Sequence, residues 1–443
     1  MSDKESKSPF NVKGIYFHDG FTVEPKSHAP LYWDYEGWER EIKWLSALGI
    51  NAVEFATMFE FSRIPSTDME RKKIRDRLQV LKLAHQFDMK FGYLLSNTTV
   101  STVPEGEEPS HQGQGRGIEL CPQDPAVFEK TIAIQEWYMN TYKEADFFEE
   151  FAGDWGGCTC GVCDTSDYLR YVETLASKLA MLNPKANLYA DTWCISYWHE
   201  NPMANGWKGV FDQEIIGSQE VIAAMPNLPA NVHFALPCHH LYRPLAFTSY
   251  GSKSETPVFP TSNDVMNIHN AGKEVLAWTH FVVDDDTGRA PAWGIIHSEV
   301  RYIKGLLQSL RATGIDSVMC NLYLPYLQIS NTYAYSRLLE NPDDDPALII
   351  HDFAGLIAHP HDVEKLVEVL TWVENNSYWQ VQMPEDGRYP DLPCELSKES
   401  ALSLVDSIRP NQSPELPIPV SAESWIDDLR RSIARMDRLE VGS

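Results

Sequence analysis

Long apolar runs are missing from this 443-residue chain, which has no stretch of about 18 or more consecutive apolar residues. The N-terminal residues are polar and contain nothing like the hydrophobic region of a secretory signal peptide. We therefore expect no membrane span, and a cytoplasmic location for the chain as written. A secreted or periplasmic location would require that a signal peptide had been removed.

Basic residues are also scarce, with 37 Lys and Arg against 63 Asp and Glu and a formal net charge of −26. A surface of this charge repels phosphate, which argues against a nucleic-acid partner. Aromatic residues are abundant, with 13 Trp and 19 Tyr, and their flat faces suit the apolar faces of sugar rings. We expect a carbohydrate partner. The acidic surface is compatible with a monomer and with a homo-oligomer alike.

Short apolar segments alternate with amphipathic ones along most of the chain, which predicts about eight strand–helix units. The predicted strands are 13–17, 52–56, 90–95, 147–153, 187–193, 232–237, 274–280 and 317–322. This count predicts a (β/α)8 TIM barrel over residues 10–358, followed by a C-terminal helical extension over 359–443. A doubly wound open sheet is the alternative, but no Gly-rich phosphate fingerprint follows the first strand, and we expect no organic cofactor.

Polar and aromatic residues gather at the predicted carboxyl ends of the strands, where barrel enzymes carry their reactive groups. They are His18, Asp19, Asn97, Asp154, Trp155, Asp191, Trp193, His239, His240, Trp278, His280, Asn321 and Tyr323. A purely structural barrel would not need so many hydrogen-bonding and stacking groups on one rim. The pattern predicts a sugar-processing site.

Carboxylates within the strands add to this prediction. Because alternate strand residues face the barrel interior, an inward Asp154 would place Glu150 on the same face. Glu54, between the apolar residues Val53 and Phe55, is expected to face inward as well. Buried carboxyl groups that repel one another have raised pKa values, which keeps at least one protonated as a general acid. A purely structural role, with each glutamate bonded to Arg or to the backbone, is the alternative.

Three cysteines in one short loop form the most specific spacing in the chain, Cys158-x-Cys160-x-x-Cys163. Thiolates in this arrangement commonly hold Zn²⁺, and Cys121 is the candidate fourth ligand of a closed tetrahedral site. We expect a structural zinc. Reduced thiols without metal, or a disulfide in a secreted protein, are the alternatives.

Two stretches of the chain resemble known families. The segment Leu120–Pro125, followed by a helix and by Gly153–Cys163, resembles part of the barrel glycoside hydrolases related to β-N-acetylhexosaminidases and α-glucuronidases. Asn331–Pro342 is similar to the closing helix of those barrels. The four cysteines together resemble the zinc cluster of certain bacterial β-galactosidases. The resemblance implies a TIM-barrel glycosidase.

The chain departs from these families at the end of the fourth strand. Hexosaminidases have adjacent Asp-Glu there and the β-galactosidases have Asn-Glu, whereas this chain has Asp154-Trp155. Only the position of Asp154 is shared, so the resemblance implies the acid role for Asp154 and no nucleophile. Substrate-assisted chemistry through a 2-acetamido group would remove the need for one.

The leading hypothesis is a glycoside hydrolase that acts on a terminal sugar. Asp154 would protonate the leaving oxygen with help from Glu150, and Asp191, Asp19 or Glu54 would supply the second carboxylate. The rim aromatics, Asn97, Asn321 and the rim histidines would bind the sugar. A non-catalytic carbohydrate-binding barrel is the alternative. A metal-dependent hydrolase is a third hypothesis, but His18-Asp19-Gly20 lacks the second His of a His-x-His pair.

Overall fold

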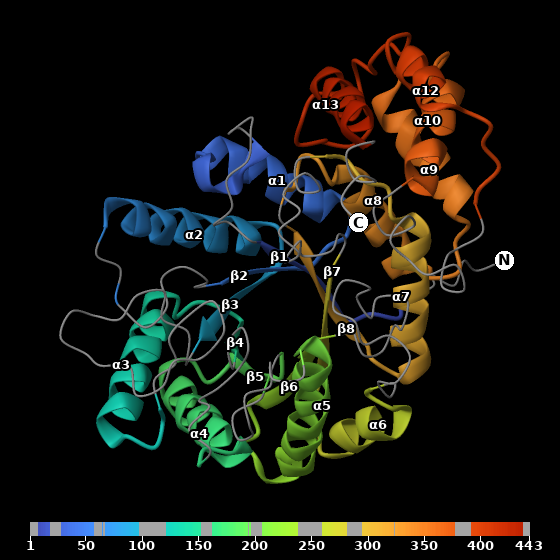
Figure 1. The fold of residues 1–443 in the computed structure, drawn as a ribbon. Coiled ribbons are helices and arrows are strands. Elements are labelled where there is room, and N and C mark those ends of the chain that lie inside the picture. Colours follow the sequence, from blue (N-terminus) through green and yellow to red (C-terminus); the bar gives the residue numbers. More distant parts are fainter. Residues whose placement is uncertain are drawn as a thin grey trace, which may run out of the picture. The chain divides into compact units, whose positions relative to one another are not determined.

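The computed structural model describes residues 8–17, 28–56, 64, 67–96, 121–151, 162–193, 195, 206–237, 259–280, 295–322, 324–376 and 391–436. Eight strands follow one another around a closed barrel in chain order (Figure 1). They are β1 (Val12–Phe17), β2 (Ala52–Ala56), β3 (Lys90–Ser96), β4 (Phe147–Phe151), β5 (Asn187–Asp191), β6 (Val232–Pro237), β7 (Val275–His280) and β8 (Ser317–Leu322). The predicted (β/α)8 barrel is confirmed.

Helices follow the strands as the sequence predicts. The helices of the barrel are α1 (Tyr35–Ala47), α2 (Asp68–Gln86), α3 (Pro125–Thr141), α4 (Thr165–Leu182), α5 (Gly206–Ala224), α6 (Ser262–Asn270), α7 (Val300–Thr313) and α8 (Ile329–Glu340). The C-terminal helices are α9 (Pro346–Ile357), α10 (Val363–Asn375), α12 (Lys398–Val405) and α13 (Ala422–Arg435). Among the described helices, none combines the length and the apolarity that crossing a membrane requires.

Local chemistry explains where several helices begin. Thr67 and Glu70 form a capping box at α2, in which each side chain accepts a hydrogen bond from the other residue's backbone N–H, at 3.2 and 2.8 Å. Asp164 and Asp167 do the same at α4. The α3 helix starts with Pro125, whose missing N–H costs nothing at the first helical position. These capping residues fix the first turn of α2, α3 and α4.

The chain divides into two compact units. One consists of Met1–Asn51, His280–Arg311 and Cys320–Ser443, and the other of Ala52–Thr279 and Ala312–Met319. In the second unit, β2 to β7 pair in parallel, and α2 to α5 lie outside the strands that they connect (Figure 1). The predicted boundary near residue 358 is not tested by this division and stays a prediction.

The register of the strands shows which side chains face the barrel interior. Gly92 pairs with Phe147, and a Cβ atom on Gly92 would lie 2.1 Å from the ring of Phe147. The glycine therefore makes room for an inward-facing Phe147, and every second residue of β4 shares that direction. The opposite face meets the helices, since Tyr93 stacks on Tyr142 of the α3 C-terminus with ring centroids 4.1 Å apart.

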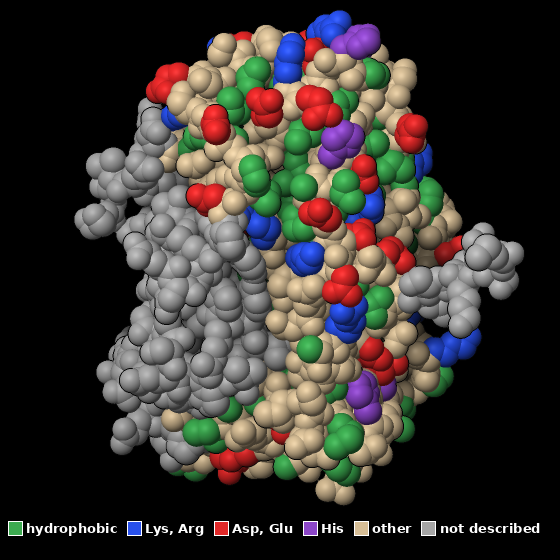
Figure 2. Space-filling view, turned by 90° about the vertical axis from the view of Figure 1, so that its right-hand side faces the viewer, with side chains coloured by type: hydrophobic (Ala, Val, Ile, Leu, Met, Phe, Trp, Pro, Cys, Tyr) green, Lys and Arg blue, Asp and Glu red, His purple; other side chains and the backbone are tan. Residues whose placement is uncertain are grey.

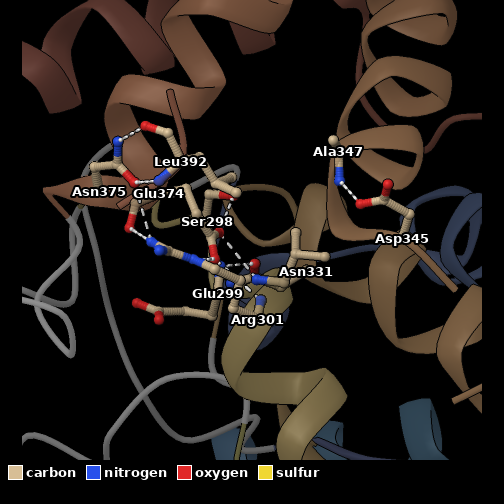
Figure 3. A network of polar contacts seen from close by, with 10 residues as sticks. Ser298, Glu299, Arg301, Asn331, Asp345, Ala347, Glu374, Asn375 and Leu392 are labelled. Atoms are coloured by element: carbon tan, nitrogen blue, oxygen red, sulfur yellow. Dashed lines mark hydrogen bonds and ion pairs between the residues drawn. The ribbon is translucent and has the colours of Figure 1, made fainter. Parts of the chain in front are cut away.

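In the first unit, α7 is joined to α10 by a buried polar network centred on Glu374 (Figure 3). The carboxylate of Glu374 accepts hydrogen bonds from the Ser298 hydroxyl at 2.7 Å and from the backbone N–H groups of Val300 and Arg301 at 3.0 Å. It also accepts one from Nε of Arg301 at 3.0 Å. A negative charge at the first turn of α7 complements the helix dipole, so Glu374 ties the extension to the barrel helix.

Charged side chains of both signs are interspersed over the described part of the face in Figure 2. Ion pairs at the surface also occur among the described residues, as between Arg337 and Asp352 at 2.6 Å. The described part of this face carries no broad basic patch.

Candidate active site

Three carboxyl groups face the interior of the barrel from neighbouring parts of the sheet. They belong to Glu54 on β2, Glu149 on β4 and Asp191 at the carboxyl end of β5, and they are 0–2% exposed. Glu149 lies two residues after the inward-facing Phe147, and Asp191 pairs with Phe151, the next inward position of β4. Because alternate residues share a face, strand geometry directs these groups into the barrel, with Asp191 at the end where barrel enzymes react.

Glu150 does not belong to this group, and its predicted inward orientation is wrong. Its carboxylate accepts hydrogen bonds at 3.1 and 3.2 Å from Nε2 of Gln135, which lies on α3 in the outer helix layer. Glu149 occupies the inward position instead, because the residues of a strand alternate in direction and the two glutamates are adjacent. The prediction of an inward Glu54 is confirmed.

Burial and mutual repulsion shape the electrostatics of the site. Burial, and to a lesser extent the charge of Asp191, raises the pKa of Glu54 well above its usual range. Burial and the charges of Glu54 and Asp191 do the same to the pKa of Glu149. For Asp191, burial raises the pKa to about 7, although hydrogen bonds from the Trp193 backbone and from Glu149 act in the opposite direction. Asp191 can therefore exchange a proton near neutral pH, while Glu54 and Glu149 are shifted toward their protonated forms.

Helix α4 and the residues after β5 hold Asp191 in place. The hydroxyl group of Tyr168 donates to the backbone carbonyl oxygens of Glu150 and Asp191, both at 2.8 Å, and so ties the ends of β4 and β5 together. The backbone N–H of Trp193 donates to Oδ1 of Asp191 at 3.0 Å. Tyr168 thus holds the backbone of Asp191, and the Trp193 N–H holds its carboxylate.

Two of the predicted aromatic residues lie close together. The rings of Trp193 and Trp278 meet edge to face, with centroids 5.5 Å apart. Trp278 lies on β7 in the register position of Pro237 on β6. The two rings therefore meet near the carboxyl ends of β5 and β7, and their role in holding a sugar stays a prediction.

The other predicted site residues are only partly covered by the structure. Asn321 lies on β8 and is buried, and His280 is the last residue of β7, of which only the backbone is described. The remainder lie outside the described residues, and their roles stay predictions: His18, Asp19, Asn97, Asp154, Trp155, His239, His240 and Tyr323.

The structure describes two of the four cysteines in the predicted cluster, Cys121 and Cys163. The Sγ atoms of Cys121 and Cys163 lie 3.7 Å apart, too far for a disulfide bond of about 2.05 Å. Cys158 and Cys160 lie outside the described residues. Within the described ranges, no group of three or more His, Cys, Asp or Glu side chains has the arrangement of a metal site.

Sequence reasoning missed two acidic members of the site. Glu149 could have been found, since either of two adjacent glutamates in a strand can be the inward one and only the register decides. Glu214 is buried on α5, and its charge raises the pKa of Asp191. Its position within a long helix gave no signal that it approaches a strand end.

Comparison with known proteins supports the fold. No family model matches the sequence, and no curated protein matches it. A glycoside hydrolase family 138 enzyme targeting pectin rhamnogalacturonan II is similar in structure, with a TM-score of 0.55, 10% identity and coverage of 98% of this chain. The chain spans only 57% of that enzyme's length.

Two further structures are similar at a lower TM-score. A variant of the O-GlcNAc hydrolase from Thermobaculum terrenum has a TM-score of 0.50 and 10% identity, over 97% of this chain and 84% of the other. The protein CpGH84D has a TM-score of 0.50 and 11% identity, over 98% of this chain and 66% of its own. At such low identity, these likenesses establish the barrel fold.

Proposed function

We propose that this protein is a glycoside hydrolase that acts on a terminal sugar of an oligosaccharide or glycoconjugate. The observation that carries the proposal is the set of buried, inward-facing carboxyl groups of Glu54, Glu149 and Asp191, which titrate above their usual range. Glycosidic hydrolysis needs one carboxyl group that is protonated and one that is ionised near neutral pH. The names of two structural neighbours, a pectin-targeting enzyme and an O-GlcNAc hydrolase, support this class.

The candidates for the second carboxylate were Asp191, Asp19 and Glu54, and of the two that the structure describes, Asp191 is better placed than Glu54. It lies at the carboxyl end of its strand, whereas Glu54 lies in the middle of β2. With Asp154 as the general acid, the ionised Asp191 would activate water or attack the anomeric carbon. Trp193 and Trp278 would contact the apolar face of the sugar.

A panel of chromogenic aryl glycosides tests the proposal. We expect the protein to release the aryl group from at least one terminal glycoside with a rate that saturates with substrate. Binding of the same sugars should be measured in parallel by calorimetry. Sugar binding without turnover of any glycoside would contradict hydrolysis and would identify a non-catalytic carbohydrate-binding barrel.

We also propose a structural zinc held by Cys121, Cys158, Cys160 and Cys163. Tetrahedral zinc with Zn–S bonds of about 2.3 Å places two sulfur ligands about 3.8 Å apart. The 3.7 Å between the Sγ atoms of Cys121 and Cys163 fits this spacing. Cys163 is one residue before Asp164, the N-cap of α4, so the metal would fix the loop that follows β4 onto that helix.

Metal analysis tests the zinc proposal. We expect about one zinc ion per chain, and we expect Cys121→Ser to lose zinc and to lower the melting temperature, because the metal would stabilise the fold. Cys394→Ser is the matched control, since Cys394 belongs to the predicted C-terminal extension and its Sγ contacts the backbone oxygen of Glu368. A metal-free protein whose melting temperature is insensitive to chelators would show that these thiols hold no zinc.

A further inference from the structure

A pocket of about 550 Å³ lies where the start of α13 meets α1 and the segment between β8 and α8. Its walls come from Arg40 on α1, from Tyr326 and from parts of residues 410–424, all of which belong to the same compact unit. Its volume lies in the range of small-molecule sites. None of its described lining residues is a carboxyl group of the candidate active site.

The first turn of α13 forms one wall of this pocket. The Ser421 hydroxyl caps the helix by accepting the Ser424 N–H at 3.1 Å. The backbone N–H groups of Ala422 and Glu423, also in the lining, donate to no described residue. Such N–H groups, at the positive end of the helix dipole, favour an anion. Many helix ends have this property, so the rest of the lining decides what the pocket binds.

Tyr326 contributes a buried hydroxyl group that lacks a partner. The residue is only 6% exposed, and its ring is fixed by stacking on Trp33, with centroids 4.6 Å apart, and by an edge contact with His28. The hydroxyl has hydrogen-bond geometry with none of the described residues. Burial and the charge of Glu41 raise its pKa, so it stays protonated and can donate. A ligand in the pocket would supply the missing acceptor.

Arg40 supplies positive charge to the same pocket. Its side chain is exposed and forms no ion pair with any described residue. It lowers the pKa of the Tyr326 hydroxyl, which places the two groups near each other although they do not meet in hydrogen-bond geometry. His28 adds no net charge, because it pairs with Asp428 at 2.5 Å. Glu41 adds little, because burial raises its pKa to about 8.

The opposite wall of the pocket is apolar. It consists of Pro410, Pro414, Ile418, Pro419 and Val420. Proline rings fix the backbone, so this wall is shaped before a ligand arrives. An inorganic ion would leave such a wall in water, whereas the carbon body of an organic acid would cover it.

We propose that this pocket binds a small organic carboxylate. Arg40, the Tyr326 hydroxyl and the first N–H groups of α13 would hold the anionic group, and the proline-rich wall would contact its carbon body. Guanidinium groups suit carboxylates because they donate two parallel hydrogen bonds. A sugar acid and a non-carbohydrate acid share this chemistry. Binding here does not depend on the proposed hydrolysis.

Calorimetric titration of the full chain with four probes tests the chemistry of the pocket. Glucuronate and cyclohexanecarboxylate carry the anionic group on a six-membered ring, whereas glucose lacks the charge and inorganic phosphate lacks the ring. We expect one of the two carboxylates to bind about tenfold more tightly than glucose or phosphate. The better carboxylate identifies the source as a sugar acid or a non-carbohydrate acid. Glucose or phosphate binding as tightly as both carboxylates, or no carboxylate binding at all, would overturn the inference.

Variants of opposite sign then locate the binding. We expect Arg40→Gln to weaken binding of the better carboxylate about tenfold, because it removes a charge-assisted hydrogen bond. Glu423→Gln should strengthen it about two- to fivefold, because Glu423 is the exposed acidic residue of the lining. Lys43→Gln is the matched control on α1, since Lys43 pairs with Glu39 at 3.1 Å.

Unchanged carboxylate affinity in Arg40→Gln would place the binding elsewhere and overturn the inference. Tyr326→Phe, which keeps the ring on Trp33 and removes only the hydroxyl, should also weaken binding. Both Arg40 and Glu423 are exposed, so their variants decide the question even if Tyr326→Phe does not fold. Carboxylate binding without glycoside turnover would reject the proposed function alone, and turnover without carboxylate binding would reject this pocket alone.

Discussion

Asp191→Asn is expected to lower kcat/KM for a cleaved glycoside by about 10²–10⁴-fold, with the fold unchanged. The substitution keeps the size of the side chain and its bond from the Trp193 N–H, but the amide cannot take up a proton or attack the sugar. The loss therefore measures chemistry rather than packing. Initial rates over a range of substrate concentrations, with circular dichroism to check folding, provide the measurement.

Glu150→Gln is the control for this variant. It removes a buried carboxylate from the neighbouring strand, but this carboxylate faces the helix layer and contacts Gln135. We expect kcat/KM close to that of the unmodified protein. A rate that falls with Glu150→Gln and persists with Asp191→Asn would show that the inward and outward roles on these strands are assigned the wrong way round.

Glu374→Leu is expected to lower the free energy of unfolding by about 3–5 kcal/mol, the largest stability effect that we foresee. Arg301 and Glu374 are both buried, with side chains 8% and 3% exposed, so the variant removes the carboxylate that neutralises a guanidinium in the interior. It also leaves the first N–H groups of α7 and the Ser298 hydroxyl without their acceptor. Urea denaturation followed by tryptophan fluorescence measures the change.

Glu364→Leu provides the control on the same helix. Its carboxylate pairs with His351 at 3.3 Å, but the side chain is 80% exposed, and such pairs contribute about 0–1 kcal/mol. In addition, the double variant Arg301→Leu with Glu374→Leu should recover part of the loss, since no unpaired charge remains. Equal, small effects of Glu364→Leu and Glu374→Leu would contradict a central role for the Glu374 network.

The fold could be predicted from sequence because its signals are local. A local sequence pattern of a few residues identifies apolar strands such as Val232–Pro237 and the start of capped helices such as Asp68–Gln86. Their alternation then leaves few topologies, since parallel strands joined by helices close most simply as a barrel. The eight predicted strands accordingly match the observed ones to within two residues at each end.

The site could be predicted only in part, because it depends on register. The alternation around Glu54 was clear, since both neighbours are apolar. In Phe147–Phe151, two adjacent glutamates compete for the inward position, and only the pairing of Gly92 with Phe147 decides in favour of Glu149. Glu214 approaches Asp191 from a helix, and such a long-range contact leaves no pattern in the sequence.

Chemical rescue tests the central claim most directly, which is that the Asp191 carboxylate takes part in glycoside cleavage. In Asp191→Ala the carboxylate is removed, and added azide can occupy its place as a nucleophile. We predict that the variant is nearly inactive, and that azide restores release of the aryl group with formation of a glycosyl azide detectable by NMR. An Asp191→Ala variant that hydrolyses the same glycoside at the unmodified rate without azide would contradict the claim.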